Sequence, residues 1–192
     1  MLSVVVLISG SGSNLLALLK ATENPLFPVK VSAVGSDKDA AGLAHAELFE
    51  IDTFVVQPER FESREAWGEV LLKNINHHQP DLVVLAGFMK ILPTNVVRAL
   101  SGRLINTHPS LLPNFPGAHA VRDALAAGAT STGVTIHKVD EGVDTGEVIV
   151  QQEVVIQPGD SEEQLHERIK VVERELLVKT IEEIALRKIN LI

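Results

Sequence analysis

The sequence predicts an α/β fold: a mostly parallel sheet flanked by helices, with an antiparallel strand pair and a long helix toward the C-terminal end. Up to residue 86, apolar β-branched runs alternate with amphipathic segments, which is the pattern of a parallel sheet covered on both faces. Beyond residue 101, two strand-like runs are joined by an acidic loop, and one long amphipathic segment follows them.

The first half of the chain contains four expected strands and three expected helices. The strands are Ser3–Ser9, Val29–Gly35, Thr53–Gln57 and Asp81–Ala86. The helices are Ser13–Ala21, Ala40–Phe49 and Ser63–His77, the last with Ala66, Val70 and Leu71 at helical spacing. This Rossmann-like order predicts that ligands bind at the carboxyl ends of the strands.

The second half is less regular. Gly102–Thr107 is expected to be a strand that runs into the proline-rich turn His108–Gly117, with a helix over Ala118–Ala127. Thr132–Val139 and Glu147–Ile156 are expected to pair in antiparallel fashion. Ser161–Arg187 is expected to be a single helix, capped by Ser161 with glutamates in its first turn.

Length and composition narrow the possible functions. A chain of 192 residues is expected to form one domain, 1–192, and the absence of cysteine excludes disulfides and thiolate catalysis. The net charge of −8 argues against nucleic acid as a partner. No apolar run approaches the roughly 20 residues of a membrane span, so we expect a cytoplasmic protein without a membrane partner. No His, Asp and Glu set has zinc-site spacing, so no metal is expected.

The turn Ser9–Asn14 (SGSGSN) joins a buried strand to a helix. Its glycines allow a tight turn and a close approach to a ligand, and the helix N-terminus offers free N–H groups. The turn lacks the Gly-Lys-Ser/Thr of a P-loop, and Leu15 occupies the third glycine position of a dinucleotide fingerprint. It therefore indicates either a phosphate or carboxylate site or a plain turn with Ser13 as the N-cap.

Asn106 and His108 form a second candidate pair. Alternate residues of a strand share one face, so the two side chains project together, roughly 6–7 Å apart along the chain, and Pro109 keeps His108 extended. An amide donor beside an imidazole suits a reacting carbonyl, because one stabilises an oxyanion and the other transfers a proton. The alternative is a polar strand end with a structural histidine.

The loop Asp140–Gly146 carries three carboxylates between the two C-terminal strands. One interpretation is an exposed acidic hairpin loop. The other is that Asp144 orients His108 or relays a proton through water, and their opposite charges would then favour a protonated imidazole. His137, between Ile136 and Lys138, is expected simply to pack in its strand.

Several segments together resemble one family. They are VVLISGSGSN (5–14), SREAW (63–67), LVVLAGFMKIL (82–92), INTHPSLLPNFPGAHA (105–120), TGVTIHKVDEGVDTG (132–146) and the helix around Glu173. They run in family order over nearly the whole chain. In them the sequence resembles the folate-dependent formyltransferases, and among these the phosphoribosylglycinamide (glycinamide ribonucleotide) formyltransferases of purine synthesis.

The resemblance implies transfer of a formyl group from 10-formyltetrahydrofolate, a co-substrate, to the amine of glycinamide ribonucleotide through a tetrahedral intermediate. It implies that Asn106 and His108 stabilise the oxyanion, and that His108 also acts as general acid toward the leaving folate nitrogen. Asp144 would support His108 and assist proton transfer. It divides the domain into a nucleotide-binding half, 1–100, and a catalytic and folate-binding half, 101–192.

The resemblance also assigns residues to each substrate. Gly12, Ser13 and Asn14 match the phosphate loop, Glu173 matches a ribose-contacting carboxylate, and Lys170 adds positive charge beside it. The folate-site residues are implied to be Arg64, Met89, Lys90, Ile91, Leu92, Asn106, Asp140, Glu141, Gly142, Val143 and Asp144.

The chain departs from some relatives at one position, because Val121 stands where they carry a second histidine after His119. We therefore assign no catalytic role to His119. A cis peptide bond at Leu112-Pro113 would suit the tight turn. Three alternative functions are methionyl-tRNA formyltransferase, formyltetrahydrofolate hydrolase and a non-catalytic binding module. Either a monomer or a homodimer fits the sequence.

Overall fold

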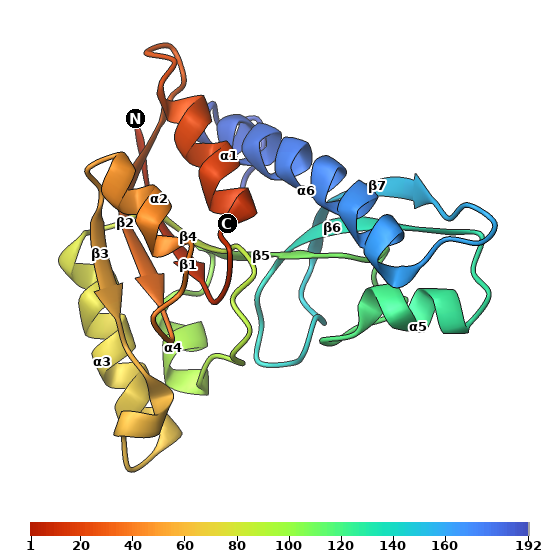
Figure 1. Ribbon diagram of the computed structural model, residues 1–192. Coiled ribbons are helices and arrows are strands. Elements are labelled where there is room, and N and C mark those ends of the chain that lie inside the picture. The colour runs from red at the N-terminus through yellow and green to blue at the C-terminus, as the bar shows by residue number, and fades with distance from the viewer. Residues whose placement is uncertain (192) are drawn as a thin grey trace.

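A computed structural model, which describes residues 1–191, contains a sheet with helices on both faces (Figure 1). The sheet strands are β1 (Leu2–Ile8), β2 (Val29–Ser36), β3 (Asp52–Val55), β4 (Leu82–Leu85), β5 (Leu104–His108), β6 (Ser131–Lys138) and β7 (Val148–Val155). Their spatial order is β3-β2-β1-β4-β5-β6-β7. β1 to β5 pair in parallel, and β6 and β7 extend the sheet in antiparallel fashion. The predicted fold class is confirmed.

Helices cover the two faces of this sheet. They are α1 (Ser13–Thr22), α2 (Leu43–Leu48), α3 (Arg64–His77), α4 (Thr94–Ala99), α5 (Ala120–Ala126) and α6 (Glu162–Ala185), with a short 3-10 turn, η1 (Pro58–Arg60). One core cluster joins the sheet to α1, α2 and α6, and a second joins the opposite face to α3 and α4. Figure 1 shows α1 beside α6 on one side of the sheet and α3 with α4 on the other.

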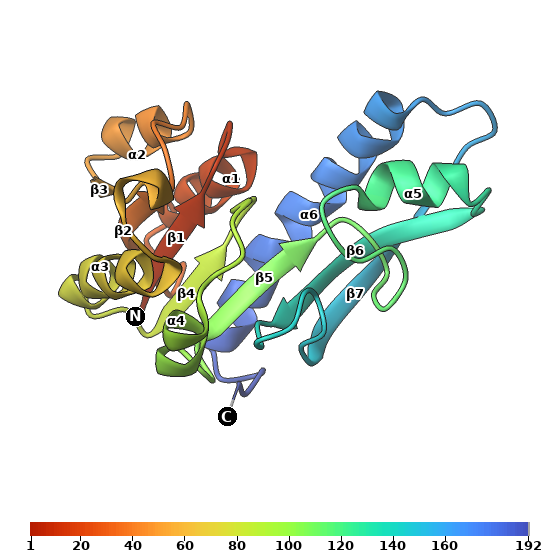
Figure 2. The same ribbon diagram turned by 90° about the horizontal axis from the view of Figure 1, so that it is seen from below.

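Helix α6 ties the two halves of the chain together. Its N-terminus is held by a capping box. The Ser161 hydroxyl accepts from the backbone N–H of Gln164, and the side-chain oxygen of Gln164 accepts from the backbone N–H of Ser161. Leu177 and Ile181 pack with α1 in the same core cluster as β1, while Leu165 and Ile169 pack under α5, β6 and β7. Figure 2 shows α6 crossing the sheet from α1 to α5.

Most element boundaries agree with the sequence-based expectations, and the differences have local causes. Helix α2 begins at Leu43 instead of Ala40, because the chain turns at 40–42 and Gly42 packs against the backbone of the turn after β1. Helix α4 and the turn η1 were not predicted. Val70 is exposed, since the buried stripe of α3 is formed by Trp67, Leu71 and Ile75.

Two further features concern the backbone and the membrane. The Leu112-Pro113 peptide bond is cis, which confirms that expectation. Within residues 1–191, no helix combines the length and the apolar character that crossing a bilayer requires.

Candidate active site

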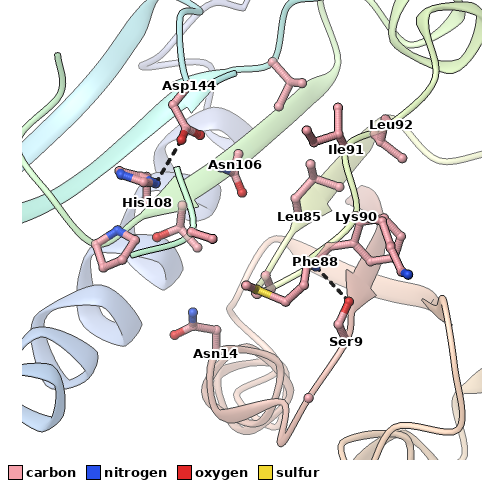
Figure 3. A pocket seen from close by; sticks show the side chains of 18 of the residues that line it. Ser9, Asn14, Leu85, Phe88, Lys90, Ile91, Leu92, Asn106, His108 and Asp144 are labelled. Atoms are coloured by element: carbon pink, nitrogen blue, oxygen red, sulfur yellow. Dashed lines mark hydrogen bonds and ion pairs between the residues drawn. The ribbon is translucent and has the colours of Figure 1, made fainter. Parts of the chain in front are cut away.

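A cavity of about 810 Å³ lies at the carboxyl ends of the central strands, where the topology predicts a ligand. It is lined by the turn after β1, the segment after β4, the end of β5, the 140–144 loop and α6. Its volume suits an organic substrate of drug-like size or larger. In Figure 3, Asp144, His108 and Asn106 lie on one side of the pocket, Ile91 and Leu92 on the other, and Asn14 below.

The turn after β1 reaches α1 through a glycine with a left-handed backbone. Gly12, with φ of 70°, is the N-cap of α1, so the alternative with Ser13 as the N-cap is wrong. A Cβ at Gly12 would lie 3.0 Å from the Cα of Gly42. No side chain caps the helix, which leaves its first N–H groups for a ligand. Asn14 lines the cavity at 6% exposure, and its Oδ1 has no hydrogen-bond partner among residues 1–191.

Asn106 and His108 are alternate residues at the C-terminal end of β5, and both line the cavity, as the strand alternation predicted. Nε2 of His108 donates to the carbonyl of Phe115, 2.9 Å away, and its Nδ1 lies 3.4 Å from Oδ2 of Asp144. Because a carbonyl only accepts, Nε2 carries a proton. The other ring nitrogen, Nδ1, therefore faces the Asp144 carboxylate.

His137 is a candidate site residue that sequence reasoning missed. It stands directly opposite Asn106 in the β5–β6 pairing, is almost fully buried, and lines the cavity. Its Nδ1 donates to the carbonyl of Lys138, while its Nε2 lies 3.2 Å from Nδ2 of Asn106 and 3.6 Å from Oδ1 of Asp144. Nε2 therefore accepts from the amide when the ring is neutral and donates to the carboxylate when it is protonated. Only the β5–β6 register could have revealed this.

The Asp144 carboxylate is held between two histidines and a backbone amide. The pKa of its carboxyl lies below the ordinary value of 3.8, chiefly through the interaction with the neighbouring His137 ring, and burial opposes this shift. The Gly117 amide, 2.8 Å from Oδ2, and the charges on His108 and His137 lower the pKa further. Asp144 is thus ionised near neutral pH and able to accept a proton.

The remainder of the acidic loop is built to hold its own shape. Asp140 accepts hydrogen bonds from the Gly142 amide at 3.0 Å and from the Thr145 hydroxyl at 2.7 Å. Glu141 forms an exposed ion pair with Arg98 of α4 at 2.7 Å. These contacts give the loop a fixed shape. Most of its residues are exposed, as the hairpin interpretation expects, whereas Asp144 is partly buried and faces His108.

The segment after β4 forms the apolar wall and is tied at three points. The Met89 amide donates to the Ser9 hydroxyl at 2.8 Å, and Lys90 pairs with Glu59 at 3.1 Å. Arg64 donates to the carbonyl of Ile91 at 2.7 Å, although Arg64 is not among the residues that line the cavity. The other expected folate-site residues all line it.

Two residues of α6, Lys170 and Glu173, line the cavity. Glu173 is buried and accepts a hydrogen bond from the Thr107 hydroxyl at 2.9 Å, while Lys170 pairs with Glu167 at 2.7 Å. His166 and Lys38, which sequence reasoning did not single out, also line the cavity.

The arrangement suits acyl transfer. The side-chain amide of Asn106, the imidazole of His108 and the carboxylate of Asp144 line one cavity, beside a helix N-terminus and an apolar wall. An amide, an imidazole and a carboxylate are groups that can stabilise a tetrahedral oxyanion and move protons around it. Among the described residues, no group of three or more His, Cys, Asp or Glu side chains is arranged to hold a metal ion.

Comparisons with known proteins agree with this chemistry. Residues 2–181 match the family model described as formyl transferase. The chain is 45% identical over 189 residues to a phosphoribosylglycinamide formyltransferase of Mycobacterium tuberculosis, covering 98% of this chain and 87% of the relative. It is 43% identical over 173 residues to the enzyme of the same name from Escherichia coli, covering 90% and 82%.

Solved structures give the same result. The crystal structure of glycinamide ribonucleotide transformylase 1 from Symbiobacterium toebii superimposes with a TM-score of 0.93 at 39% identity, over 96% of this chain and 88% of that chain. The matches span nearly the whole chain and all the segments that line the cavity. The chain therefore belongs to the formyl transferase family and, within it, to the phosphoribosylglycinamide formyltransferases.

Proposed function

We propose that this enzyme transfers the formyl group of 10-formyltetrahydrofolate to the glycinamide amine of 5′-phosphoribosylglycinamide, giving the N-formyl ribonucleotide and tetrahydrofolate. The observation that carries the proposal is the convergence of Asn106, His108 and Asp144 at one point of the cavity. That point lies between a turn suited to a phosphate and an apolar wall suited to a flat ring.

The ribonucleotide occupies the end of the cavity near α1. Its phosphate accepts hydrogen bonds from the N–H groups at Gly12, Ser13 and Asn14, where the helix dipole favours negative charge. Glu173, held by Thr107, accepts from the ribose hydroxyls, and Lys170 contributes positive charge. A local anion site of this kind explains how a chain with net charge −8 binds a phosphate.

The folate occupies the other end. Its pterin ring lies between the segment Met89–Leu92 and the loop 140–144, with apolar side chains on its faces and backbone groups at its edges. Arg64 acts from behind the segment by fixing the Ile91 carbonyl. This placement brings the formyl group to the end of β5, where Asn106 and His108 stand.

The reaction proceeds by attack and collapse. The glycinamide nitrogen attacks the formyl carbon, a C–N bond forms, and the carbonyl oxygen becomes an oxyanion that accepts from Nδ2 of Asn106 and Nδ1 of His108. Nδ2 of Asn106 carries two hydrogens. One is donated to Nε2 of His137, which keeps the amide in position, and the other is left for the oxyanion. The bond from carbon to the folate nitrogen then breaks.

The protons balance within the His108–Asp144 pair. Asp144 takes the proton that the attacking amine loses, directly or through water, and His108 gives its Nδ1 proton to the departing folate nitrogen. The separation of 3.4 Å lets Asp144 return a proton to His108, which restores both groups for the next turnover. The low pKa of Asp144 keeps it ionised and ready before attack.

The proposed reaction needs only its two small-molecule substrates. We propose that the partners are small molecules only, with no role for nucleic acid, and that either a monomer or a homodimer could perform the reaction, because every assigned residue lies on one chain.

A folate absorbance assay tests the proposal. Purified protein is mixed with 10-formyltetrahydrofolate, with and without 5′-phosphoribosylglycinamide. We expect deformylation only when the ribonucleotide is present. Equal deformylation without it would identify a formyltetrahydrofolate hydrolase instead, and no turnover in either mixture would favour a binding module or a different acceptor.

A further inference from the structure

Helix α2 contacts the turn after β1 from the side that faces away from the cavity. The turn residues Gly10, Ser11 and Gly12 line the cavity, whereas Gly42 and His45 of the α2 region do not. The Gly42 amide donates to the Gly10 carbonyl at 2.9 Å, and Nε2 of His45 donates to the Ser11 carbonyl at 3.1 Å. Both bonds pull carbonyl oxygens of the turn away from the cavity.

These bonds determine where the neighbouring N–H groups point. A trans peptide is planar, and its N–H is directed opposite to its C=O. The only cis peptide bond found in residues 1–191 is Leu112-Pro113, so the Ser11–Gly12 peptide is trans. With the Ser11 carbonyl held by His45, the Gly12 N–H points away from α2 and toward the cavity. His45 thereby fixes the direction of one donor of the turn.

The contact is close enough to leave little freedom. A Cβ on Gly42 would lie 2.9 Å from the Gly10 oxygen and 2.9 Å from the Gly12 Cα, and a Cβ on Gly12 would lie 3.5 Å from Cδ2 of His45. The His45 ring is therefore packed against the turn as well as bonded to it. Gly12 itself has φ of 70°, a conformation that favours glycine.

We propose that His45 is a positioning residue of the phosphate subsite, which sets the Gly12 peptide plane so that its N–H faces the phosphate of the ribonucleotide. The inference rests on the proposed function, because it assumes that a phosphate occupies the turn. His45 touches neither the cavity nor the reacting atoms, so its effect is confined to binding one substrate.

The test uses two variants of similar size. His45→Leu keeps the bulk against the turn and removes the donor, whereas His45→Gln keeps a side-chain N–H that can reach the same carbonyl. We expect His45→Leu to raise the dissociation constant for 5′-phosphoribosylglycinamide about 3- to 10-fold, the loss typical of one hydrogen bond. His45→Gln should restore binding to within about twofold. The dissociation constant for 10-formyltetrahydrofolate and kcat should be unchanged in both.

A second ligand separates the phosphate from the remainder of the nucleotide. The dephosphorylated glycinamide riboside should bind wild type and His45→Leu equally, because only the phosphate uses the Gly12 N–H. Weaker binding of the riboside, an equal loss of folate binding, or a His45→Gln variant no better than His45→Leu would overturn the inference.

The inference and the proposed function fail in different ways. A wild-type protein that transfers formyl while His45→Leu binds the ribonucleotide as tightly overturns only the role of His45. A wild-type protein that binds no ribonucleotide overturns both.

Discussion

At the scale of single residues, the proposed mechanism depends on the pair formed by His108 and Asp144. Nδ1 of His108 faces a carboxylate at 3.4 Å, while Nε2 is committed to the Phe115 carbonyl. Nδ1 is therefore the ring nitrogen that the proposed mechanism uses. If the pair is broken, the oxyanion loses a donor and the leaving nitrogen loses its acid.

Replacing His108 by alanine should lower kcat by two or more orders of magnitude, which is the usual contribution of a general acid or an oxyanion donor. Steady-state rates at saturating concentrations of both substrates measure the effect. His77→Ala is the matched control, because His77 is exposed at the end of α3 and is not among the residues that line the cavity. Rates near wild type in His108→Ala would remove this residue from the mechanism.

Asp144 also predicts how stability depends on pH. Its pKa is lower in the folded protein than the ordinary 3.8, so ionisation stabilises the fold above that value, and the stabilisation is lost as pH falls through the folded pKa. The difference in urea midpoint between wild type and Asp144→Asn should collapse only below pH 3.8.

Urea titrations of both proteins at a series of pH values provide this measurement. A difference that disappears well above pH 3.8 would mean that the pKa of Asp144 is raised instead of lowered.

Residue-level prediction from the sequence succeeded where local geometry sufficed. The period of two placed Asn106 and His108 on one face, and the glycines marked the turn after β1. His137 could not be recognised in this way, since its role depends on standing opposite Asn106 in a strand paired across 31 positions of sequence. Cross-strand register is a tertiary property that a single strand pattern does not contain.

At the scale of elements, the junction of β1 and α1 is the unit that we propose binds the phosphate. The N-terminus of α1 carries no acidic residue in its first turn and no side-chain cap, so its positive end is available. The same junction is braced by Gly42 and His45 on one side and by the Ser9–Met89 bond on the other.

Ser13→Glu should therefore weaken ribonucleotide binding by an order of magnitude or more while leaving folate binding nearly intact. The new carboxylate would occupy the anion position, and it would not harm the helix because negative charge is favourable there. Isothermal titration with each ligand separates the two effects. Ser13→Gln, of equal bulk and no charge, is the control, and equal loss of both ligands in Ser13→Glu would indicate misfolding.

Helices and strands could be predicted from the sequence where their hydrophobic patterns extend over many residues. The strands of the parallel sheet, the antiparallel pair and α6 were all expected, because apolar runs and a 24-residue amphipathic helix give strong signals. Helix α4 has only six residues and follows Pro93, so its pattern is too short to distinguish from a loop. The start of α2 was misplaced because contact with the turn after β1, a tertiary effect, sets it.

At the scale of the whole molecule, the two halves that the sequence suggested are joined by strand pairing and by helix packing. β4 of the first half pairs directly with β5 of the second, and α6 packs against α1. The cavity itself is formed from both halves, so neither half contains a complete site. We infer that 1–100 and 101–192 fold and function as one unit.

One cooperative unfolding transition should follow from this arrangement. Trp67, the single tryptophan, is buried in the α3–α4 core of the first half, whereas α6 dominates the helical signal of the second. Tryptophan fluorescence and far-ultraviolet circular dichroism should therefore give coincident urea midpoints. Two separate midpoints would show that the halves are independent domains.

The central claim is tested most directly by following the formyl carbon. Wild-type protein is given 10-formyltetrahydrofolate isotopically labelled in its formyl group, together with 5′-phosphoribosylglycinamide, and the label is located by NMR. The account predicts that the label appears on the glycinamide nitrogen in step with the release of tetrahydrofolate. Label recovered as free formate, or left on the folate, would contradict it.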